Sequence, residues 1–193
     1  MDVPEPSALS LTMGSCGVSV RHLGIVMDQA ARLPYHNWRH CVRTALRAHR
    51  SATLYGIDSC PLLVAALYHD VRHLGPCARS DGENIARAVE CWLELGRPAE
   101  LAVAELMHRE PPAWLADVPR LIVATRFPHT PTDAFDELVL RNADLAETLD
   151  PQWLEHYETE TGGPAIPGFA EAHMVDLAAI ARGRVSANRA AVA

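Results

Sequence analysis

The chain has 193 residues, 49% of them hydrophobic, and a formal net charge of −7. This length suits a single domain that buries its own core, and the apolar content excludes a disordered tail. The negative charge disfavours a long polyanion such as nucleic acid as partner. A small phosphorylated substrate remains compatible, because a metal ion can supply positive charge locally.

Neither a membrane partner nor export is predicted from this sequence. The longest apolar runs, such as residues 61–68, are far shorter than the roughly 20 residues that span a bilayer. The first five residues lack the basic and apolar regions of a signal peptide, so we expect a cytoplasmic protein. The cysteines are odd in number and form no CxxC pair, which favours reduced thiols over disulfides. They are Cys16, Cys41, Cys60, Cys77 and Cys91.

Most of the chain has the apolar periodicity of amphipathic helices, and β-branched and aromatic residues are outnumbered by Ala, Leu, Glu and Arg. We therefore predict a compact all-α bundle of about eight helices. In chain order these cover residues 18–33, 37–55, 62–73, 81–95, 99–109, 114–126, 136–149 and 169–182. We expect residues 1–17 to be a loose segment, residues 18–183 the domain, and residues 184–193 a flexible tail.

Several residues predict where these helices begin and end. Pro34 stops the first helix, and Gly56 ends the second. Ser80 predicts the N-cap of helix 81–95, which has an acidic first turn, and Gly96 is expected to end that helix. The Gly-Gly-Pro sequence at 162–164 predicts a turn-rich break before the last helix, and no helix is assigned to residues 151–161.

The first group of residues that suggests chemistry is His36 and His40. Four positions apart on a helix, they share one face, where one can bind a metal and the other act as a neighbouring acid or base. The structural alternative is a pair of surface or hydrogen-bonded core histidines, and the short motif alone does not exclude it.

His69 and Asp70 form the second group, at the end of an apolar helix. Burying two polar side chains there costs free energy unless a partner satisfies them, and a divalent metal would do so. Imidazole and carboxylate together suit Zn, Mn, Fe or Mg. As an alternative, His69 and His73 complement the helix dipole, but this does not explain Asp70.

Asp144 is the third candidate, because it lies among Leu140, Ala143 and Leu145 on a stretch that is otherwise expected to face inward. A buried carboxylate needs a cation or several hydrogen-bond donors. The alternative is an aspartate exposed to water.

The order His…His-Asp…Asp resembles the HD superfamily of metal-dependent phosphohydrolases, and most closely the catalytic domains of class I cyclic-nucleotide phosphodiesterases. Residues 35–40 are similar to their YHNxxH signature, and residues 69–75 to their HDxxHxG segment. Residues 121–129 and 139–145 are similar to two further motifs in the same order. Residues 81–88 partly resemble the acidic helix start of small bacterial HD phosphohydrolases.

This resemblance implies an HD-domain helical bundle that binds one or two divalent ions. It implies that His40, His69, Asp70 and Asp144 bind the first ion, that Asp70 also bridges to a second, and that His36 is the general acid. The residues that it places around the metal or the water are His73, Glu83, Thr125 and His129. Phe169 is placed to stack on a base, but Ile166 stands where the phosphodiesterases carry a nucleotide-clamping Gln. The expected substrate is therefore a small, nucleotide-like phosphate ester.

Three alternatives remain open. A di-iron oxygenase of the inositol oxygenase branch has the same fold and uses two further histidines, for which His108 and His129 are candidates. A non-enzymatic HD module would bind a nucleotide as a sensor. A structural helical protein would carry these histidines by chance. Arg39, Arg43 and Arg72 lie close in sequence to the candidate ligands, and solvated surface charge is the expected role of most of them.

Overall fold

The computed structural model describes residues 6–75 and 80–192, with side chains as far as residue 184. Over these residues it is helical and contains no β-strand, apart from an isolated bridge between Ala30 and Val71. The all-α prediction is therefore confirmed. None of the described helices is both long and apolar enough to cross a bilayer.

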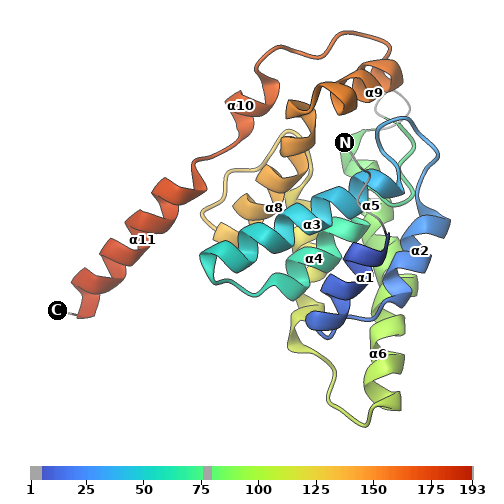
Figure 1. The fold of residues 1–193 in the computed structure, drawn as a ribbon, viewed down its shortest axis with the longest axis vertical. Helices are drawn as coiled ribbons and strands as arrows, with labels where there is room; N and C mark the ends of the chain where they lie inside the picture. Colours follow the sequence, from blue (N-terminus) through green and yellow to red (C-terminus); the bar gives the residue numbers. More distant parts are fainter. Residues whose placement is uncertain (1–5, 76–79, 193) are drawn as a thin grey trace.

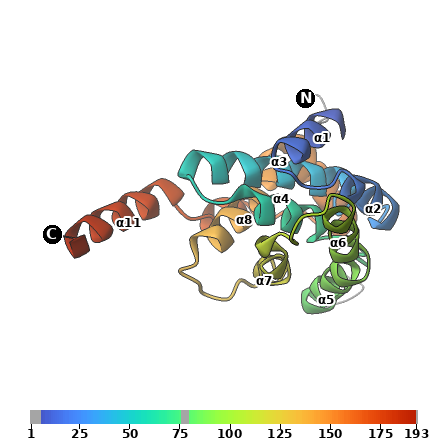
Figure 2. The ribbon, with the colours of Figure 1, turned by 90° about the horizontal axis from the view of Figure 1, so that it is seen from below.

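The centre of the bundle is α4 (Ser59–Tyr68), in which every residue from Pro61 to Tyr68 is buried. A helix that is apolar on all faces is stable in water only when other helices surround it. Long α3 (Trp38–Tyr55) packs along one side of α4 and α7 (Val118–Ala124) along the other, as Figure 2 shows. The chain leaving the end of α4 therefore begins inside the molecule.

The remaining helices, apart from α11, lie around these three (Figure 1). They are α1 (Pro6–Ser15), α2 (Arg21–Gln29), α5 (Asp81–Cys91), α6 (Arg97–Leu106), α8 (Phe135–Leu145), α9 (Pro151–Thr161), α10 (Phe169–His173) and α11 (Leu177–Val192). Short 3₁₀ turns cover Ala113–Ala116 and Ala146–Leu149. Helix α11 extends away from the bundle in both views (Figures 1 and 2).

Both ends of the chain contain more helix than predicted. Residues 6–15 form α1 rather than a loose segment, and Leu9 and Met13 are fully buried. Two buried apolar side chains on one face account for this helix despite the Ser and Gly content. Residues 1–5 of that segment lie outside the described residues. The predicted helix 169–182 is divided into α10 and α11 by an extended Met174, and α11 continues through the predicted tail to Val192.

The prediction that Gly96 ends a helix is wrong. The chain passes from α5 through a π-helical turn, Trp92–Gly96, directly into α6. A Cβ atom on Gly96 would lie 2.3 Å from Trp92 Cε3 and 2.8 Å from Tyr68 Cζ. Glycine is required here by close side-chain packing and not by a left-handed backbone.

Two further boundaries matter for the site. Helix α4 ends at Tyr68, so His69 and Asp70 lie just beyond it and not inside a helix that runs to residue 73. Helix α9 was not predicted. Asp150 caps it by accepting from the Gln152 N–H, Pro151 opens it, and Gly162 ends it in a left-handed conformation.

The cysteines Cys16, Cys41, Cys60 and Cys91 are free thiols, in agreement with the expected reduced state, and Cys77 lies outside the described residues.

Candidate metal centre

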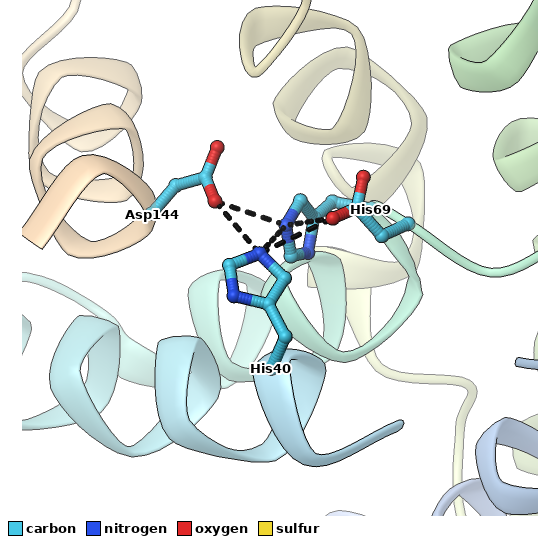
Figure 3. Close-up of side chains that lie close together, drawn as sticks. His40, His69 and Asp144 are labelled. Carbon is cyan, nitrogen blue, oxygen red and sulfur yellow. Dashed lines mark hydrogen bonds and ion pairs between the residues drawn. The ribbon is translucent and has the colours of Figure 1, made fainter. Parts of the chain in front are cut away.

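Four side chains from three segments meet in the interior. His40 comes from the first turns of α3, His69 and Asp70 follow α4, and Asp144 is near the end of α8 (Figure 3). His40 Nε2 lies 3.1 Å from His69 Nε2, 3.2 Å from Asp70 Oδ2 and 3.0 Å from Asp144 Oδ1. His69 Nε2 lies 3.2 Å from each of the same two carboxylate oxygens. The four predicted ligands are thus brought together.

The other ring nitrogen of each histidine has its own partner. His40 Nδ1 donates to Glu147 Oε2 at 2.6 Å, and His69 Nδ1 donates to the Ala66 carbonyl at 2.7 Å. Each Nε2 is then left with a lone pair that points toward the centre of the cluster. Such hydrogen bonds fix the tautomer and ring orientation of metal-binding histidines.

Glu147 is itself fixed on both sides and is fully buried. Arg43 Nε donates to Glu147 Oε1, and Arg47 lies 2.8 Å from the same oxygen. Arg43 also reaches Asp150 at 3.2 Å. Arg43 is therefore a buried support for the His40–Glu147 pair and not a solvated surface charge.

The pKa values in the cluster are shifted because two imidazoles and two carboxylates lie close together. Burial alone would lower the pKa of His69, yet Asp70 and Asp144 raise it well above its ordinary value. Burial would raise the pKa of Asp70 and of Asp144, yet the adjacent imidazoles hold both well below the usual range. The cluster therefore demands positive charge, which either protons or a cation can provide.

The donor set fits a divalent metal ion. All four donor atoms lie within 4.8 Å of one another, with two nitrogens and two carboxylate oxygens. An ion with bonds of about 2.1 Å in octahedral geometry has neighbouring ligand atoms about 3 Å apart, close to the separations seen here. Imidazole donors suit Zn and Fe, and carboxylate donors suit Mn and Mg. The two imidazoles and two carboxylates of this site are therefore compatible with each of these four ions.

His36 lies beside this cluster in a second group of titratable residues. Its Nδ1 donates to Glu160 Oε1 at 2.5 Å, while the backbone N–H groups of Tyr35 and His36 donate to Glu160 Oε2. The His36 ring stacks on His73 with centroids 3.9 Å apart and planes 6° apart. Burial lowers the pKa of His73 to about 4, so the His73 ring is neutral near pH 7.

A cavity of about 220 Å³ opens onto both groups. His36, His69, Asp70, His73 and Asp144 line one part of it. Apolar and aromatic side chains also line the cavity, and these are Tyr35, Ile85, Phe127, Leu145, Tyr157 and Phe169.

Three of the remaining predicted residues also line the cavity. Thr125 is buried and its hydroxyl donates to the Ile122 carbonyl. His129 is partly buried, and burial together with Arg141 lowers its pKa. Phe169 contacts Phe127, with ring centroids 5.2 Å apart. Phe127 is 39% exposed at the cavity rim.

Two candidates do not reach the cavity. Glu83 is exposed and completes a capping box with Ser80, accepting from its backbone N–H at 3.1 Å. The cavity-facing residues of that helix start are Asp81 and Asn84. His108 is exposed just beyond the end of α6 and does not line the cavity.

Glu147 and Glu160 are the residues that sequence reasoning missed. Glu147 lies three positions after Asp144, a spacing that places both on one helical face, and this signal was available. Glu160 lies on α9, whose Asp150-Pro151 start and Gly162 end are recognisable helix signals. Their partners lie 107 and 124 residues away along the chain, so the contacts themselves have no local pattern.

No family model matches the chain, and no curated protein is significantly similar to it in sequence.

Proposed function

We propose that this protein is a metal-dependent phosphohydrolase that cleaves a small phosphate ester, either a phosphomonoester or a phosphodiester. The observation that carries the proposal is the convergence of His40, His69, Asp70 and Asp144 beside a cavity that His36, the partner of Glu160, also lines. The HD-type motifs support the same conclusion. The ion is Mn, Mg, Zn or Fe, and one or two are held.

When bound, a divalent ion lowers the pKa of a coordinated water toward neutrality and offsets charge on phosphate oxygens. The contribution of the chain is to hold the donor atoms in place. Glu147 and the Ala66 carbonyl keep both Nε2 lone pairs directed inward. By the same resemblance, Asp70 would also provide a ligand to a second ion.

His36 supplies the proton for the leaving oxygen. Glu160 accepts the Nδ1 proton of His36, which leaves Nε2 to carry the proton that is transferred. The carboxylate also stabilises the charged imidazolium before transfer. The stacked His73 remains neutral and therefore adds no repulsion to that charge.

The aromatic residues that line the cavity suit a flat group on the substrate. Phe127 and Phe169 lie in contact with each other, and Tyr157 also lines the cavity. Aromatic rings stack on any nucleobase, whereas a reading amide would distinguish between bases. Ile166, which stands at the expected Gln position, is 70% exposed. We therefore expect weak preference between adenine and guanine nucleotides.

Turnover under strict anaerobiosis tests the proposal against the oxygenase alternative. Purified protein is supplied with Mn and screened with phosphomonoesters and phosphodiesters. We expect phosphate-ester hydrolysis that needs a divalent ion and no molecular oxygen. Activity that requires iron and consumes oxygen, or no hydrolysis with any divalent ion, contradicts the proposal. His108, one of the two extra histidines that the oxygenase alternative would use as ligands, does not line the cavity.

A further inference from the structure

Two thiols meet on the opposite end of α4 from the candidate metal centre. Cys16 follows directly after α1, and Cys60 lies in the first turn of α4. The Cys60 thiol donates to the carbonyl oxygen of Cys16 at 3.3 Å, although the two residues are 44 positions apart. Both cysteines are partly exposed, so a small molecule in solvent can reach them.

The surroundings distinguish the two thiols. Cys16 Sγ lies 3.7 Å from His49 Nδ1 and 3.8 Å from the Ser59 hydroxyl. Burial and Arg50 lower the pKa of His49, so its ring is neutral near pH 7 and can accept a proton. Burial, Asp58 and the neighbouring Cys16 raise the pKa of the Cys60 thiol to about 12. Cys16 is thus the thiol with a base beside it, and Cys60 remains protonated until a partner sulfur reacts with it.

We propose that Cys16 and Cys60 form a site of reversible oxidation, which a peroxide converts into an intramolecular disulfide. His49 takes the Cys16 proton, and the thiolate attacks one peroxide oxygen and breaks the O–O bond. The released hydroxide takes the proton back from His49, which gives the Cys16 sulfenic acid and one water. Sulfur is oxidised by two electrons and the peroxide is reduced by two. The Cys60 sulfur then displaces the sulfenic oxygen, which leaves as a second water with the Cys60 proton.

This disulfide would tie the segment after α1 to the start of α4. Cross-linking residues that are far apart in sequence restricts the unfolded chain and so raises the melting temperature. For a chain of this size we expect a rise on the order of 10 °C. The ligands at the other end of α4 are not touched, so the inference does not depend on the proposed hydrolase activity.

Peptide mapping tests this directly in the unmodified chain. Cleavage after arginine places Cys16 in residues 1–21 and Cys60 in residues 51–72, each as the only cysteine of its peptide. After hydrogen peroxide treatment we expect these two peptides to be linked, the melting temperature to rise, and dithiothreitol to reverse both. Absence of the link once the thiols have reacted, or links between other cysteines, overturns the proposal.

Variants separate the two steps. Cys60→Ser should stop at a Cys16 sulfenic acid that dimedone traps, without a rise in melting temperature, and Cys16→Ser should give neither product. His49→Ala should slow oxidation of Cys16 severalfold. The matched control is Cys77→Ser, which should leave the link intact. Each reduced variant is first compared with the wild-type chain by circular dichroism, and trapping at Cys60 instead of Cys16 contradicts the assigned order.

Discussion

Two buried histidine–glutamate pairs in this molecule look alike and differ in what surrounds the second ring nitrogen. His40 donates to Glu147 at 2.6 Å, and His22 donates to Glu100 at 3.0 Å, with all four side chains fully buried. In the second pair the remaining nitrogen, His22 Nδ1, accepts from the Tyr68 hydroxyl at 2.9 Å. Both nitrogens of His22 are therefore satisfied by the protein.

The remaining nitrogen of His40 has no such donor. It faces His69 Nε2 and the carboxylates of Asp70 and Asp144, all of which are acceptors when the rings are neutral. A histidine is saturated when both of its ring nitrogens have hydrogen-bond partners within the protein, as in the His22–Glu100 pair, and such a histidine stabilises the fold. A histidine whose second nitrogen faces only acceptors can instead bind a cation. Burial and a glutamate partner alone therefore do not identify a ligand.

The largest expected effect comes from removing one of the four candidate metal ligands. His69→Ala deletes one of four donors, so metal binding and hydrolysis should both be lost. The control is His22→Gln, which alters the saturated pair. It should lower the melting temperature but keep the full metal content. Elemental analysis and turnover of both variants make the comparison, and full metal occupancy in His69→Ala contradicts the ligand assignment.

His36→Ala should give the next largest effect. It should retain the metal, because His36 is not one of the four converging donors, but lose on the order of 10²–10⁴ in turnover. The loss should shrink for nitrophenyl esters, whose leaving groups need no proton. Turnover is measured across esters of increasing leaving-group basicity. A loss that is independent of the leaving group would show that His36 is not the general acid.

The parts of this comparison that sequence could predict are those determined by local pattern. Residues 37–55 were predicted to be helical, and α3 covers nearly the same range because Asn37 caps its start and Gly56 ends it in a left-handed conformation. His69 and Asp70 could be chosen as candidate ligands because a His-Asp pair at the end of an apolar helix conflicts with burial unless a partner is present.

What could not be predicted depends on tertiary contacts. Gly96 follows a helix as a C-terminal glycine should, yet the rings of Trp92 and Tyr68 require it inside a continuous helix. His22 and His40 have similar apolar neighbours in sequence, and only the folded structure shows that one meets a hydroxyl and the other meets three acceptors.

The two glutamates provide a matched pair of intermediate effect. Glu147→Gln weakens the hydrogen bond that orients His40, so metal affinity should fall on the order of 10–100-fold. Glu100→Gln makes the same chemical change at the saturated pair and should leave metal affinity unchanged. Titration of the folded variants with Mn or Zn measures both. Equal losses of affinity would mean that Glu147 acts only through general stability.

The smallest expected effect is the pH dependence of the saturated pair. Burial alone would raise the pKa of Glu100, but the contacts with His22, the Ser19 N–H and Arg109 lower it below its ordinary value of 4.5. The folded state therefore binds the Glu100 proton more weakly than the unfolded state does. Its contribution to the free energy of unfolding is fully present above about pH 4.5 and is lost as the pH falls through the folded pKa.

Glu100→Gln should be less stable than wild type by about 1–3 kcal/mol at neutral pH. This difference should shrink in acid, because only the wild type loses the charge. Urea unfolding of both chains at neutral pH and below pH 4 measures it, and other titrating carboxylates cancel in the difference. A gap that stays constant across this range would mean that Glu100 is not held ionised by His22.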